Sequence, residues 1–138
     1  MYSSFFRVFG RFLSGVQEQK VQKKECFTVE NQSVYEECIK ACQECLYACN
    51  HCFDKCLMEV DSGLMAECIR LDRECAEMCA IAVQALTRNS PYAEDICLLC
   101  AKVCEACGNE CSLYKHDHCQ ACAESCYRCA EACRKMAS

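Results

Sequence analysis

Cysteine recurs with helical spacing through one stretch of the chain. Its six cysteines are separated by four, three, four, three and four residues, and they are Cys38, Cys42, Cys45, Cys49, Cys52 and Cys56. Side chains three and four residues apart share one face of an α-helix, whereas a strand would place them on opposite faces. The spacing therefore predicts a helix whose buried stripe, normally built from Leu and Ile, consists of thiols.

The same spacing returns in three later segments, so we predict helices over residues 33–59, 64–88, 91–113 and 118–135. Capping patterns, Ser33 with Glu36 and Asp117 with Gln120, are typical of the first turns of the first and fourth helices. Four helices with short connections favour an all-α fold, an antiparallel up-down-up-down four-helix bundle with a cysteine-lined core. The later stripes comprise Cys68, Cys75, Cys79, Cys97, Cys100, Cys104, Cys107, Cys111, Cys119, Cys122, Cys126, Cys129 and Cys133.

We divide the chain into an N-terminal extension, residues 1–28, and a four-helix bundle domain, residues 29–138. The extension places Phe5 and Phe9 on one helical face and Arg7 and Arg11 on another, and its one cysteine is Cys26. We interpret it as an amphipathic or a disordered segment. It lacks the small-residue cleavage site of a signal peptide, and no apolar run approaches the ~20 residues of a membrane span.

Twenty cysteines among 138 residues would indicate a disulfide framework in a small secreted protein. Cysteines three or four apart on a helix, however, have Cβ atoms about 5–6 Å apart, and a disulfide requires about 3.5–4.5 Å. We therefore expect reduced thiols and a cytoplasmic location. The net charge of −5 argues against a nucleic-acid partner. No acid–base pair or nucleophile constellation is apparent, so we do not expect an enzyme.

Thiols at inward positions bury less apolar area than leucines, so a bound group must offset that loss. Thiolates favour Cu(I), Zn(II) and iron–sulfur clusters. A four-thiolate Zn(II) site has a net charge of −2, whereas one Cu(I) per thiolate is neutral and suits a dry core. We predict a store of many Cu(I) ions. The alternatives are a zinc or soft-metal buffer of the metallothionein type, or a thiol redox or iron–sulfur protein.

Polar and sulfur-containing side chains should gather at one end of the bundle, where the first and third connections meet. Thioether and imidazole groups near a thiol-lined opening suit Cu(I), and we predict His116 and His118 as metal ligands in addition to the cysteines. His51 lies off the cysteine stripe. The side chains expected at this end are Met58, Asp61, Met65, His116 and His118.

Three segments carry a resemblance to a known family: YEECIKACQECLYACNHCFDKC, ECIRLDRECAEMCAIA and ICLLCAKVCEACGNEC. With the cysteines that follow them, they resemble the cytosolic bacterial copper storage proteins over residues 33–137. The resemblance implies a homotetramer of four-helix bundles, each filled with Cu(I) ions that the cysteines from Cys38 to Cys133 hold along the bundle axis. The extension and Cys26 depart from the family pattern.

Overall fold

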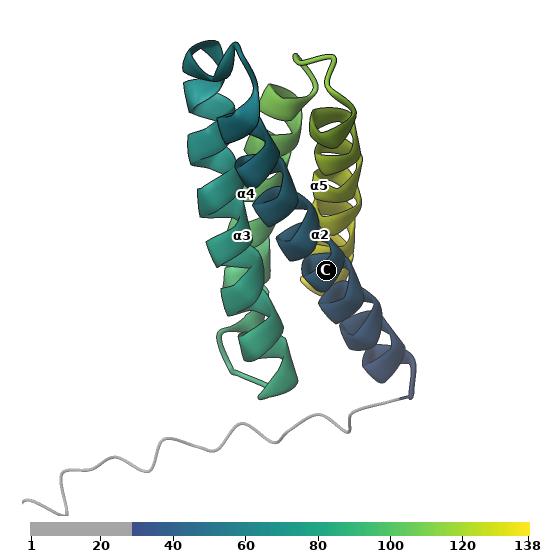
Figure 1. Ribbon diagram of the computed structural model, residues 1–138. Helices are drawn as coiled ribbons and strands as arrows, with labels where there is room; N and C mark the ends of the chain where they lie inside the picture. Colours follow the sequence, from purple (N-terminus) through teal and green to yellow (C-terminus); the bar gives the residue numbers. More distant parts are fainter. Residues whose placement is uncertain (1–28) are drawn as a thin grey trace, which may run out of the picture.

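The computed structural model describes residues 29–138, and all of its regular structure is helical (Figure 1). The elements are α2 (Val29–Met58), the short 3₁₀-helix η1 (Ser62–Met65), α3 (Ala66–Thr87), α4 (Ala93–Cys111) and α5 (Asp117–Met136). The predicted all-α four-helix bundle is confirmed. The sequence expectations for the extension and Cys26 lie outside the described residues.

Each helix packs against two neighbours. Helix α2 contacts α3 and α5, and α4 contacts the same two helices, so α2 and α4 lie on one diagonal of the bundle. Consecutive helices run in opposite directions, and the α2–α3 and α4–α5 connections lie at the same end, as predicted (Figure 1). We call this end, residues 59–65 and 112–118, the mouth. The α3–α4 connection closes the opposite end.

The core of the bundle consists largely of sulfur. All nineteen cysteines of the described residues are fully buried, and most of the other buried side chains are alanines. Larger buried apolar residues lie at the two ends of the core, Met65 at the mouth, and Leu86 at the end of α3 with Met136 at the end of α5 at the opposite end. At the mouth the sulfur core therefore also borders polar side chains such as His118, whereas at the other end it borders apolar side chains. None of the described helices is both long and apolar enough to span a bilayer.

The two predicted capping boxes are not formed, and one of the two helices begins earlier than predicted. Helix α2 begins at Val29 rather than near Ser33, and the Gln32 amide donates a hydrogen bond to Glu36 one turn along the same helix. Such i,i+4 pairs stabilise a continuous helix across the expected cap. At α5, Gln120 does not form a capping box with Asp117, since its amide donates instead to the backbone oxygens of Ser112 and Tyr114.

The α2–α3 and α3–α4 connections also differ slightly from expectation. The chain passes through η1 before α3 begins at Ala66, and α4 begins at Ala93 rather than at Pro91. Asn89 ends the preceding helix with a φ of 51°, in the left-handed region that asparagine tolerates. The Ser90 N–H then donates to the Ala85 carbonyl at 2.9 Å, which satisfies an otherwise free helix-end acceptor.

Gly108 of α4 lies against α5 with no room for a larger residue. A Cβ atom at this position would lie 2.9 Å from Cε1 of Tyr127 and 3.2 Å from Cβ of Cys126. Glycine costs about 1 kcal/mol relative to alanine inside a helix. Here the missing side chain lets the two helices bring their cysteine stripes together.

Candidate metal centre

The buried sulfurs form a continuous column along the bundle axis. Neighbouring Sγ atoms lie between 3.5 Å, as in Cys68–Cys111 and Cys75–Cys104, and 4.0 Å, as in Cys56–Cys68. A disulfide requires about 2.05 Å, so these sulfurs are separate thiols. Two metal–sulfur bonds of about 2.3 Å each span at most about 4.6 Å. The spacing of the column therefore allows one soft metal ion to bridge neighbouring sulfurs.

The sulfurs group into overlapping quartets in which all ligand atoms lie within 4.8 Å of one another. Cys45 and Cys75 belong to two of these quartets, and so do Cys49 and Cys126. These shared members link three of the quartets. Contacts between sulfurs link the other two to them, Cys79–Cys100 at 3.9 Å for one, and Cys68–Cys111 with Cys107–Cys111 for the other. The quartets are Cys42–Cys100–Cys129–Cys133, Cys45–Cys49–Cys75–Cys126, Cys45–Cys75–Cys79–Cys104, Cys49–Cys107–Cys122–Cys126 and Cys52–Cys56–Cys68–Cys119.

The helical spacing CxxxC and the spacing CxxC have different roles in this array. CxxxC partners contact each other within one helix, as in Cys45–Cys49 at 3.8 Å and Cys52–Cys56 at 3.7 Å. Cys49 and Cys52, which form a CxxC step, take partners on α5 instead: Cys49 contacts Cys126, and Cys52 contacts Cys119. The alternation therefore gives α2, α4 and α5 pairs of their own as well as links between helices.

Asp72 is a buried carboxyl group inside the thiol core that the sequence analysis missed. Its Oδ1 accepts hydrogen bonds from Cys107, Cys111 and Cys122 at 3.3–3.4 Å, and its Oδ2 accepts one from Cys68 at 3.8 Å. Burial, reinforced by the nearby sulfurs of Cys122 and Cys107, raises the pKa of Asp72 to about 10. The carboxyl group is therefore protonated and neutral at pH 7 in the metal-free protein.

The helical period contained the signal for Asp72. The cysteines of α3 stand at positions 68, 75 and 79, and a stripe that alternates four and three residues requires a member at position 72. Aspartate occupies that position in the sequence. An acidic residue at a stripe position where the period calls for cysteine therefore predicts a polar group in the core.

Burial also favours the protonated form of two thiols near the mouth, Cys56 and Cys119, in the metal-free protein. It raises the pKa of Cys119 to about 12, with the nearby sulfur of Cys68 adding to the effect, and it raises the pKa of Cys56 in the same way. A thiolate, not a thiol, binds a metal ion, so metal binding must release protons from this core. Neutral thiols also avoid the cost of uncompensated buried charge before metal arrives.

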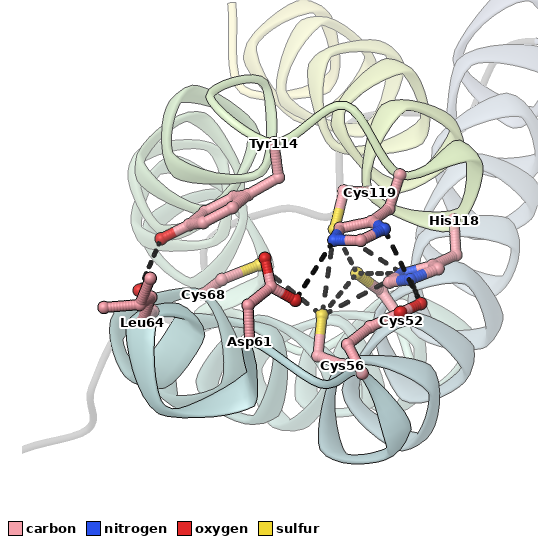
Figure 2. Close-up of polar contacts among 10 residues, drawn as sticks. Cys52, Cys56, Asp61, Leu64, Cys68, Tyr114, His118 and Cys119 are labelled. Atoms are coloured by element: carbon pink, nitrogen blue, oxygen red, sulfur yellow. Dashed lines mark hydrogen bonds and ion pairs between the residues drawn. The ribbon is translucent and has the colours of Figure 1, made fainter.

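The two histidines predicted from the sequence both lie at the start of α5, at the mouth. Figure 2 shows that His118 faces the sulfurs. Its Nδ1 lies 3.5 Å from Sγ of Cys119, 3.6 Å from that of Cys52 and 3.9 Å from that of Cys56. His116 stacks on His118 with the ring centroids 5.3 Å apart. The Cys52–Cys56–Cys68–Cys119 quartet is thus the part of the sulfur column that an imidazole covers.

His116 points toward acidic groups rather than toward sulfur. Its Nδ1 lies 3.6 Å from Glu59, and its Nε2 lies 3.5 Å from Asp61. Beside it, the Tyr114 hydroxyl donates to the Leu64 carbonyl at 3.2 Å and ties the α4–α5 connection to η1 (Figure 2). Of the two histidines, His118 is therefore the one whose ring contacts the sulfurs directly.

The remaining sequence candidates separate into buried and exposed groups. Met65 is fully buried at the mouth end of the core, whereas Met58 is 71% exposed. His51 is exposed and stacks on Tyr47 with the ring centroids 6.0 Å apart, so it lies outside the sulfur column, as its position off the stripe predicted.

Comparison with known proteins identifies the family of this array. Residues 31–138 match the sequence profile of the copper storage protein family. The chain belongs to this family. The match covers the whole described bundle except its first two residues, and it includes every buried cysteine. The copper storage role of the family is a binding function.

Two solved copper storage proteins have the same fold. The Cu(I)-bound protein BsCsp3 of Bacillus subtilis is 57% identical, with a TM-score of 0.74 over 76% of this chain and 99% of that one. The Streptomyces lividans protein Ccsp, solved with 10 copper equivalents, is 33% identical, with a TM-score of 0.77 over 84% and 92% of the two chains. A cysteine-rich Bacillus subtilis protein, YhjQ, is 58% identical over 81 residues, which are 59% of this chain and 75% of the relative.

Proposed function

We propose that this copper storage protein holds many Cu(I) ions reversibly in its thiol core, in the cytoplasm, and that it is not an enzyme. The observation that carries the proposal is the set of nineteen buried thiols, most of which lie in quartets whose spacing fits bridging metal ions. A relative from Streptomyces lividans is described as a cytosolic copper storage protein and was solved with five coppers. Keeping Cu(I) inside a closed bundle would hold it available and unreactive.

The choice of Cu(I) over Zn(II) rests on charge. One Cu(I) per thiolate leaves the core neutral, whereas four thiolates around each Zn(II) leave two negative charges buried. The described core contains no basic side chain to balance such charge, because its buried polar residues are Asp72 and Ser125. Soft thiolates also match Cu(I) well.

We propose all nineteen cysteines from Cys38 to Cys133 as ligands, with His118 completing the mouth quartet. Support for His118 comes from its Nδ1, which lies within 4 Å of three sulfurs. We retain His116 as a ligand for ions that pass through the mouth, since it stacks on His118 and its Nε2 lies 3.5 Å from Asp61. Asp72 offers oxygen, which soft Cu(I) uses less readily than sulfur.

An anaerobic titration of the reduced, metal-free protein tests the proposal. Cu(I) would be delivered from a chromophoric chelator, with Zn(II) in a parallel series. We expect a capacity near one Cu(I) per buried thiol, little Zn(II) uptake, release of protons during loading and a higher unfolding temperature afterwards. A capacity of only a few ions, or a preference for Zn(II), would overturn the storage function.

We further propose that residues 29–138 are the whole copper-binding unit and that, following the family resemblance, four chains associate. Exposed apolar side chains such as Ile81, Leu98 and Leu99 are available on the outer faces for such contacts. Deletion of residues 1–28 should leave unchanged both the copper capacity per chain and the number of chains in the assembly, which sedimentation equilibrium measures. A large loss of capacity would show that the extension belongs to the store.

A further inference from the structure

Glu59 lies behind His118, on the side of the ring that faces away from the thiols. Its Oε1 is 3.0 Å from His118 Nε2, while Nδ1 of the same ring faces the sulfurs of Cys52, Cys56 and Cys119 (Figure 2). The His118 side chain is only 11% exposed. One ring nitrogen is thus assigned to a carboxylate and the other to the metal centre.

This geometry selects one tautomer of His118. A carboxylate oxygen accepts hydrogen bonds, so the 3.0 Å contact requires the proton on Nε2. A neutral imidazole carries one ring proton, and Nδ1 therefore presents its lone pair to the sulfurs. In metal sites, the ligating histidine commonly donates its other ring N–H to a carboxylate in this way, which fixes its tautomer and orientation.

We propose that Glu59 is a positioning residue that holds His118 in the Nε2-protonated tautomer, with Nδ1 free to bind copper at the mouth. The inference rests on the proposed function and concerns a residue that does not itself contact the sulfurs. His116 stacks on the ring and restrains its plane, but stacking does not decide which nitrogen carries the proton. Only the Glu59 contact does so among the hydrogen bonds of His118 in the described structure.

The tautomer can be measured without any copper. In long-range ¹H–¹⁵N correlation spectra of the metal-free protein at about pH 8, where free histidine is neutral, we expect a protonated-type shift at Nε2 and a lone-pair-type shift at Nδ1. Glu59→Ala should convert these into averaged shifts from both tautomers. A proton on Nδ1 in the native protein, or an unchanged tautomer in Glu59→Ala, overturns the proposal.

Copper affinity supplies the second readout. In Cu(I) competition titrations, Glu59→Ala should weaken the ion bound by His118 by about tenfold or more, as is usual for loss of such a partner, and leave the total capacity unchanged. Asp54→Ala removes the same charge from an exposed position on α2 and should do neither. In a His118→Ala background, Glu59→Ala should have no further effect. An equal loss in that background would show that Glu59 acts by charge alone.

The two readouts separate this proposal from the storage function. If the native protein bound no Cu(I), storage would fail, and the spectra of the metal-free protein would still decide whether Glu59 sets the tautomer. If the native protein filled with copper and the mouth ion bound equally well to Glu59→Ala, storage would stand and the positioning role would fall.

Discussion

Replacing Cys45 and Cys75 together with serine should lower the copper capacity by about two ions per chain, one for each lost thiolate, because one Cu(I) balances one thiolate charge. The two sulfurs are 3.8 Å apart and belong to the same two quartets at the centre of the column. Their loss should also weaken binding of the ions that Cys49, Cys79 and Cys104 would share with them. An anaerobic Cu(I) titration with metal analysis of the isolated complex measures both effects.

The matched control places a hydroxyl in the core without removing sulfur. Ala76 is buried beside Cys75, so Ala76→Ser introduces a comparable polar group. A buried hydroxyl without a good partner costs about 1–3 kcal/mol, and both variants should lose stability accordingly. Only the double cysteine variant should lose capacity. An unchanged capacity in the double variant would contradict storage in the core.

Much of this array could be predicted from the sequence because the cysteine period and the helical period coincide. The alternation of three and four residues fixes which face of each helix is buried, and short connections fix the antiparallel order. These two facts together place all the cysteines from Cys38 to Cys133 inward and bring His116 and His118 to the same end as Asp61. The burial of every one of these cysteines confirms that inference.

The helix ends and the individual partners could not be predicted in the same way. Ser33 and Gln120 are residue types that often cap helices. In the structure, however, Glu36 accepts a hydrogen bond from Gln32, and Gln120 donates to the Ser112 carbonyl. Which sulfur contacts which depends on the rotation and closeness of neighbouring helices. A Cβ atom at Gly108 would lie only 2.9 Å from Cε1 of Tyr127, so the absence of one side chain affects that spacing. The contact between Glu59 and His118 likewise joins residues 59 positions apart.

Asp72→Asn should make the metal-free protein more stable at neutral pH. The pKa of Asp72 is about 10 in the folded protein and about 3.9 in an unfolded chain. Between these values the folded state binds one more proton than the unfolded state, so the stability due to this group is complete below pH 4 and is lost as pH rises toward 10. The loss is about 1.4 kcal/mol per pH unit, or about 4 kcal/mol at pH 7.

Asparagine is neutral at every pH and avoids this loss. We expect Asp72→Asn to raise the free energy of unfolding by about 2–4 kcal/mol at pH 7, with part of the gain offset by the poorer hydrogen-bond match of an amide among thiols. Below pH 4 the advantage should disappear, because aspartate is then protonated in both states. Urea unfolding of the metal-free protein between pH 4 and 7.5, under reducing conditions, measures the difference.

The pH window separates Asp72 from the thiols. Thiols of the unfolded chain ionise near pH 8.5, so below about pH 7.5 they contribute little to the slope. Asp54→Asn changes an exposed aspartate on α2 and should leave the slope as it is in the native protein. If native protein and Asp72→Asn showed parallel pH profiles, the carboxyl group would be ionised in the core. In that case a negative charge would already lie among the thiols before any metal is bound.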